Sequence, residues 1–158
     1  MGLPRILFDI EQIVMADLSK TATNVLAGVR AKTLDGIFGE ACEAGDPLYQ
    51  DSATQRWYKC DANVLAKSSF HGFALNGGAA GQPVKVDYED DDYTPGVALS
   101  LSIAAGNEIV ILSPTPGGLG RHSERAAGTY LTIIGIAKST TKMSFRRNGL
   151  SSGVPLVA

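Results

Sequence analysis

The sequence has few of the residues that form metal sites or disulfide frameworks. Its 158 residues include two cysteines, Cys42 and Cys60, and two histidines, His71 and His122. No spacing of Cys and His matches a zinc site, and two cysteines do not make a disulfide framework. We therefore expect both cysteines to be small buried hydrophobes, and we expect no metal and no other cofactor.

Basic residues are not in excess either. The chain has 14 Lys and Arg against 16 Asp and Glu, a net charge of −2, so we expect no nucleic-acid partner. No run approaches the eighteen or so apolar residues that span a membrane. Asp9 and Glu11 stand where a signal peptide would be apolar. We expect no membrane partner, and synthesis and folding in a cytoplasm.

Catalytic motifs are present only in fragments. Residues 149–153 match G-x-S-x-G, but a nucleophile elbow needs a helix after it and acid and histidine partners downstream, and Pro155 follows here instead. The loop Gly118-Leu119-Gly120 lacks the third glycine of a dinucleotide fingerprint. We expect no catalytic residues and no enzymatic activity.

Glycine and proline are plentiful, with 18 and 7 residues, and such turn-rich sequences are typical of short-stranded all-β folds. The most β-prone run is 130–137, where β-branched and aromatic residues surround Gly135. We predict strands at 39–41, 47–50, 56–60, 72–76, 84–87, 97–103, 108–112, 130–137 and 142–146, and loops at 50–55 and 115–120.

Two stretches of the chain have the same build. A small-residue turn at Gly45 leads to a strand and then to a second strand that contains Gly72, 27 positions later. The pattern recurs from Gly106 to Gly135, 29 positions apart. Two copies are too few for a solenoid. We predict an all-β fold, a small β-barrel or sandwich built from two similar half-motifs, with an extended N-terminal arm.

The arm is predicted to comprise residues 1–35, and the β-barrel-like domain residues 36–158. Within 1–14 the apolar positions follow one helical face, so this part is either a short docking helix or a functionless leader. Residues 16–35 have too few apolar side chains to bury themselves. We expect another chain to hold them, with Leu18, Val25, Val29 and Leu34 as anchors.

Two further features have alternative interpretations. Trp57 and Tyr58 either fill the core and its margin or form an interface anchor, where such residues are enriched. The acidic run from Asp87 to Asp92 is interpreted as a solvated loop between strands. The alternatives for this run are a metal site and a contact with a basic partner.

Five stretches together resemble a known family: EACEAGDPLY at 40–49, WYKCDAN at 57–63, GFALNGGAAGQPV at 72–84, ILSPTPGGL at 111–119 and YLTIIGIA at 130–137. They are similar to tailed-bacteriophage head decoration proteins, also called capsid cement proteins. The resemblance covers about residues 15–158. It rests on turn and strand patterns, and residues 89–92 and the part after Gly149 depart from it.

The resemblance implies a small structural protein of the virion, often a homotrimer, that binds the outside of the capsid. Its partners would be the major capsid protein and further copies of itself, and it would stabilise the shell by bridging capsid subunits. The alternative is another phage module, a tail-fibre or receptor-binding β domain, although no shaft of repeats is visible here.

Overall fold

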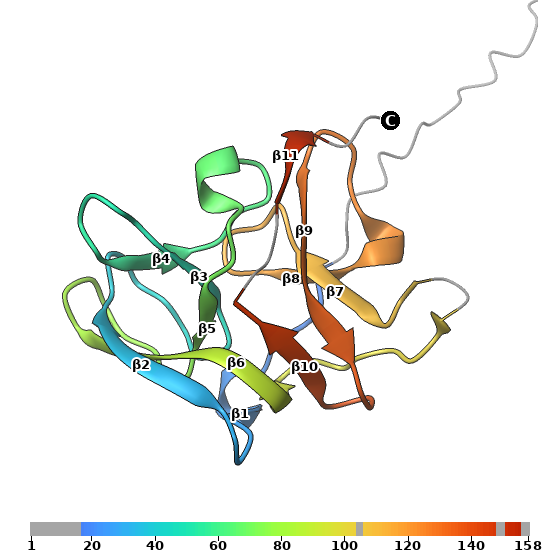
Figure 1. The fold of residues 1–158 in the computed structure, drawn as a ribbon, viewed down its shortest axis with the longest axis horizontal. Coiled ribbons are helices and arrows are strands. Elements are labelled where there is room, and N and C mark those ends of the chain that lie inside the picture. The colour runs from blue at the N-terminus through green and yellow to red at the C-terminus, as the bar shows by residue number, and fades with distance from the viewer. Residues whose placement is uncertain (1–16, 104–105, 148–150, 156–158) are drawn as a thin grey trace, which may run out of the picture.

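The computed structural model describes residues 17–103, 106–147 and 151–155 (Figure 1). The strands are β1 (Val25–Leu26), β2 (Lys32–Ile37), β3 (Pro47–Gln50), β4 (Trp57–Lys59), β5 (Gly72–Ala74), β6 (Pro83–Pro95), β7 (Ile109–Leu112), β8 (Leu119–Arg121), β9 (Tyr130–Ala137), β10 (Met143–Arg146) and β11 (Ser151–Pro155). Three-residue 3-10 helices precede β1 or lie between later strands: η1 (Ala22–Asn24), η2 (Leu65–Lys67) and η4 (His122–Glu124).

The fold is all-β, as predicted. The strands form one curled antiparallel sheet, a half-barrel, in the order β4-β3-β5-β6-β10-β9-β7-β8. Strand β6 is the longest and pairs along both edges. Asp87 is opposite Phe73 of β5 and Thr33 of β2, and Glu89 is opposite Arg146 of β10 and Lys32 of β2. Strands β5 and β10 therefore share one edge of β6, and β2 occupies the other.

The strand order also confirms the predicted duplication, because it is a palindrome of two four-stranded halves. In the first half β3 pairs with β4 and β5, and β5 pairs with β6. In the second half β7 pairs with β8 and β9, and β9 pairs with β10. A 3-10 helix, η2 or η4, stands between the second and third strands of each half. Pairing of β6 with β10 joins the halves.

The two predicted glycines occupy equivalent places. Gly72 is opposite Leu48, the second residue of β3, and Gly135 is opposite Val110, the second residue of β7. A Cβ at Gly72 would lie 2.5 Å from Val86 Cγ1 of β6, and one at Gly135 would overlap the carbonyl oxygen of Ser144 in β10. In both halves, glycine lets the third strand approach the fourth closely.

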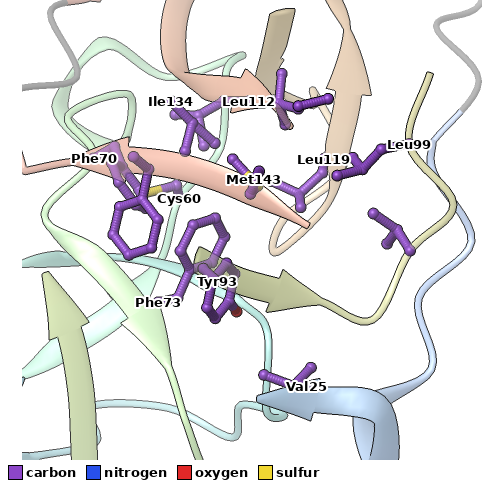
Figure 2. Close-up of a cluster of buried hydrophobic side chains, with 14 of the residues drawn as sticks. Val25, Cys60, Phe70, Phe73, Tyr93, Leu99, Leu112, Leu119, Ile134 and Met143 are labelled. Atoms are coloured by element: carbon purple, nitrogen blue, oxygen red, sulfur yellow. The ribbon is translucent and has the colours of Figure 1, made fainter. Parts of the chain in front are cut away.

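The core has two parts on opposite faces of the first half. The large cluster contains the contacting rings of Phe70, Phe73, Tyr93 and Phe145, with Phe73 and Tyr93 stacked 4.5 Å apart (Figure 2). The small cluster lies on the other face and consists of Phe38, Cys42, Leu48, Trp57, Ala74, Val84 and Val86. A parallel bridge between Phe38 and Trp57 links the end of β2 to β4 beside this cluster.

The N-terminal segment differs from its prediction. The expected division after residue 35 falls inside β2, which pairs with β6 over its whole length. Residues 17–26 lie on the domain of the same chain, where the Leu18 amide donates to the Leu119 carbonyl and the Thr21 amide to that of Gly96. Much of this contact consists of backbone hydrogen bonds, which the apolar content of the segment does not predict. The candidate helix within 1–14 lies outside the described residues.

Four predicted elements are corrected. The run from Asp87 to Asp92 lies within β6, where pairing on both sides buries Asp87 and Asp90, so it is not a solvated loop. Residues 97–103 form no strand. The side chains of Val97 and Leu99 are buried in alternation, but the segment makes no ladder of backbone pairs with a neighbouring strand. Residues 39–41 form no strand and lie between two isolated bridges, at Phe38 and Cys42. Leu119 and Gly120, expected in a loop, begin β8.

Alanine at Gly72 or Gly135 should lower the free energy of unfolding by about 1–3 kcal/mol, because each new methyl group would overlap the neighbouring strand. Gly77→Ala is the matched control, since its nearest neighbour would be the Cys42 oxygen at 3.2 Å. Urea denaturation measures all three. Equal stability of Gly77→Ala and either core variant would contradict the equivalence of the two glycines.

Candidate functional site

The six residues predicted to contact a capsid or another subunit occupy different environments. Trp57, 1% exposed, and Val25 are buried. Leu18 and Leu34 are half-buried against the large and small clusters, and Tyr58 is half-buried with its ring stacked 5.8 Å from that of Tyr49. Val29 is 100% exposed. Of these six residues, Val29 is therefore the one whose apolar side chain is free to contact another molecule. The other five pack within the chain.

Val29 stands on the turn between β1 and β2, at the lower end of the ribbon in Figure 1. The β1–β2 turn is residues 27–31, and the neighbouring Leu26 is 62% exposed. The Gly28 amide donates to Asp90 Oδ2 over 2.5 Å, and the Ala31 amide donates to the Gly28 carbonyl over 3.2 Å. The turn thus has an exposed apolar tip, and its base is held to β6 by a hydrogen bond.

Two ion pairs lie at the end of the turn that leads into β2. Arg30 lies 3.4 Å from Asp91, and Lys32 lies 3.0 Å from Glu89. All four side chains are substantially exposed, so each pair contributes little to stability. Their arrangement places an apolar tip next to charged groups of both signs, which is the composition of an interface with an apolar centre and a polar rim.

The anchor of the turn belongs to a buried acid pair, Asp87 and Asp90. Asp90 accepts hydrogen bonds from the Gly28 amide and, over 2.9 Å, from the Asp92 amide. Asp87 is fully buried, and neither of its oxygens makes a well-aligned hydrogen bond among the described residues, although the nearby Glu89 amide acts to lower its pKa. The buried hydroxyl of Tyr93 also lacks a partner there. Ionised Asp87 would be an uncompensated buried charge.

Protonation of Asp87 resolves this conflict. Burial, hydrogen bonding to Asp90 and the negative charge of Asp90 raise the pKa of Asp87 from 3.8 to about 8. At neutral pH the Asp87 carboxyl therefore holds a proton that it can donate to Asp90. Burial also raises the pKa of Tyr93 well above its ordinary value, and the charges of Asp87 and Asp90 add to this effect.

A second polar cluster lines a pocket of about 440 Å³ where residues 17–20 meet loops of both halves. The Lys20 ammonium is paired with Asp46, with side chains only 15% and 6% exposed. Asp46 also accepts from the Glu43 amide over 2.8 Å. Ser113 donates to Asp17 and accepts from the Thr115 amide. These contacts bind the N-terminal segment to loops before β3 and after β7.

The candidate nucleophiles and bases have structural partners. Burial raises the pKa of the Cys42 thiol to about 12, with Asp46 and Glu40 contributing, so this thiol stays protonated. His71 Nδ1 accepts from the Gln50 amide over 2.9 Å, and burial lowers its pKa. Ser151 lies in β11, paired opposite Thr132, and not at a strand-to-helix turn.

Within the described ranges, no group of three or more His, Cys, Asp and Glu side chains is placed to hold a metal ion. No helix in that same part of the chain has the length and apolarity to cross a membrane.

The sequence interpretation missed both polar clusters. The aromatic residues Tyr88 and Tyr93 within the acidic run favour a strand over a loop, and this signal could have located the buried acids. No comparable signal marks the Lys20–Asp46 pair, because its members are 26 positions apart and meet only in the folded chain.

The chain matches no protein-family model, and no curated protein or solved structure shows significant similarity to it.

Lys20→Met should lower the free energy of unfolding by about 3–5 kcal/mol, because it leaves the buried Asp46 carboxylate without its cation. Lys32→Met is the matched control. It breaks the exposed pair with Glu89 and should cost less than about 1 kcal/mol. Urea denaturation at pH 7 measures both, and similar losses would show that the Lys20–Asp46 pair is not a buried contact.

Asp87→Asn should remove part of the pH dependence of stability. Between pH 4 and 8 folded Asp87 binds more protons than the unfolded chain, so its contribution is complete below about pH 4 and lost by about pH 8. The free energy of unfolding of the variant should therefore rise relative to that of the wild type by up to about 1.4 kcal/mol for each pH unit in that window. Urea denaturation at pH 5, 7 and 9 measures the difference. Asp91→Asn, at an exposed carboxyl, should show no such gain.

Proposed function

We propose that this protein is a structural component of a tailed-bacteriophage virion that binds the outer surface of the capsid. In this role it bridges subunits of the major capsid protein and stabilises the shell. The resemblance at residues 40–49, 57–63, 72–84, 111–119 and 130–137 motivates the proposal. The compact half-barrel is consistent with it, because a short antiparallel fold presents many turns to a partner.

The observation that carries the proposal is the apolar tip of the β1–β2 turn. Val29 is completely exposed, although burial of a valine side chain is worth about 1.5–3 kcal/mol. The Gly28–Asp90 hydrogen bond fixes the base of the turn before any partner binds. A preformed turn loses little conformational entropy on binding, so more of the contact energy becomes affinity.

The proposal includes self-association as a homotrimer. A trimer fits a local threefold axis of a shell because each subunit repeats one contact patch. Three copies of Val29 would then engage the shell together, and linked weak contacts give an avidity far above that of one contact. Adjacent capsid subunits would be bridged without a large interface for each copy.

Light scattering of the purified full chain should give three times the subunit mass of 16.6 kDa. The mass should not change with dilution over the micromolar range if the trimer forms before binding. A monomer in solution that also occupies the capsid as isolated copies would contradict the trimer.

Val29→Ser should weaken capsid binding at least tenfold, equivalent to about 1.4 kcal/mol, without loss of stability. Val64→Ser is the matched control, because Val64 is a partly exposed valine elsewhere on the molecule. Each full-length protein is added to shells assembled from the phage with this gene deleted. Co-sedimentation gives the occupancy, and cryo-electron microscopy locates the protein.

Failure of the wild-type protein to bind such shells would overturn the proposed function. Density on the tail tip instead of the head would support the tail-fibre or receptor-binding alternative. Equal binding by Val29→Ser and the wild type would leave capsid binding intact and reject the β1–β2 turn as the contact.

A further inference from the structure

Two β-bulges in β6 bring its buried polar groups to one face. Residues three apart on a regular strand point to opposite faces. Tyr88 is an extra residue between Asp87 and Glu89 in the pairing with β2, so Asp87 and Asp90 turn to the same side. A second extra residue lies between Asp90 and Tyr93 in the pairing with β10. Asp87, Asp90 and Tyr93 therefore converge within the large cluster.

The charged groups around this pair come from several elements. A pocket of about 220 Å³ lies over Asp90. It is lined by Arg30 of the β1–β2 turn, Lys32 of β2 and Arg146 of β10, together with Glu89 and Asp91. Other charged or titratable groups that act on this cluster are Tyr93 and Asp46, which is paired with Lys20. Arg147 lies over the ring of Tyr88, 6.0 Å from its centroid.

This environment selects a proton as the ligand of the acid pair. Asp87 and Asp90 cannot both be ionised at close range without a compensating charge. The pocket has no excess of negative charge to attract a metal cation, because its three cationic side chains lie beside acids such as Glu89 and Asp91. A proton is small enough to be shared inside the cluster, where neither Asp87 oxygen makes another well-aligned hydrogen bond in the described chain.

The acid pair is directly connected to the β1–β2 turn. Asp90 Oδ2 accepts the Gly28 amide over 2.5 Å, and this bond spans 62 positions of sequence. Glycine permits this contact, because a Cβ at position 28 would overlap Asp90 Oδ1 and displace the carboxylate. Any displacement of the Asp90 carboxylate must therefore either carry the turn with it or break this hydrogen bond.

We propose that Asp87 and Asp90 form a proton-operated latch for the β1–β2 turn. While the pair shares one proton, Asp90 stays in place and holds Gly28. When a base in solution takes that proton, the two carboxylates repel, Asp90 moves toward the pocket, and the turn is released. The raised pKa of Asp87, about 8, places this transition just above neutral pH. The latch is a property of the free chain and does not depend on a capsid partner.

Nuclear magnetic resonance of the full-length protein tests the latch without a binding partner. The aspartate carboxyl carbons and the Gly28 Cα resonance are followed from pH 6 to 9.5. We expect Gly28 to shift with a midpoint near pH 8, together with one carboxyl of the pair. In Asp87→Asn, Gly28 should stay constant at its latched position. In Asp90→Asn, which keeps one acceptor oxygen but no charge to repel Asp87, the Gly28 titration should be lost.

Asp35→Asn serves as the control, because it removes an exposed acid of β2 that is paired with Lys85 outside the pocket, and it should leave the Gly28 titration unchanged. The wild-type carboxyl titration alone remains decisive if a buried variant fails to fold. Titration of the pair without a Gly28 shift would overturn the latch, as would a Gly28 shift that persists in Asp87→Asn. Displacement of the shared proton by millimolar Ca²⁺ at pH 7 would identify a cation site instead.

Discussion

The pairing of β6 along both of its edges is the constraint on which the rest of the fold depends. Its first part lies between β2 and β5, and its second part pairs with β10 and β1. One strand can serve both halves only if it bends, and the two bulges supply the bend. They also turn Asp87, Asp90 and Tyr93 inward together. The curl of the sheet, the buried acids and the anchored turn thus have one common cause.

The duplicated halves use this strand unequally. Each half has a hairpin, a 3-10 helix and a glycine-containing third strand, but β6 has thirteen residues where β10 has four. The extra length of β6 recruits β1 and β2, which have no counterpart beside β10 among the residues that the structure describes. The symmetric part of the molecule supplies the core, and the asymmetric part supplies the exposed turn.

The sequence predicted what local pattern determines. The run around Gly135 and the stretch Pro47–Gln50 were located with correct bounds, and the repeat of turn, strand and glycine identified the two halves. The sequence could not predict which charged side chains are buried. An acidic run is expected to be solvent-exposed until the strands that pair with both of its edges are known. The Lys20–Asp46 contact and the place of β2 depend on residues far apart in the chain. Five of the six predicted contact residues pack within the chain, and the sixth, Val29, is exposed.

The attachment of residues 17–26 has a consequence for the order of folding. Leu18 is hydrogen-bonded to Leu119, which is 119 − 18 = 101 positions away, and Asp17 is bonded to Ser113. During synthesis the first described residues must wait for the hairpin of β7 and β8 to emerge from the ribosome. Such distant contacts slow the folding of small β proteins. The contacts of Asp17 and Leu18 can therefore form only after residues 113–119 have been made.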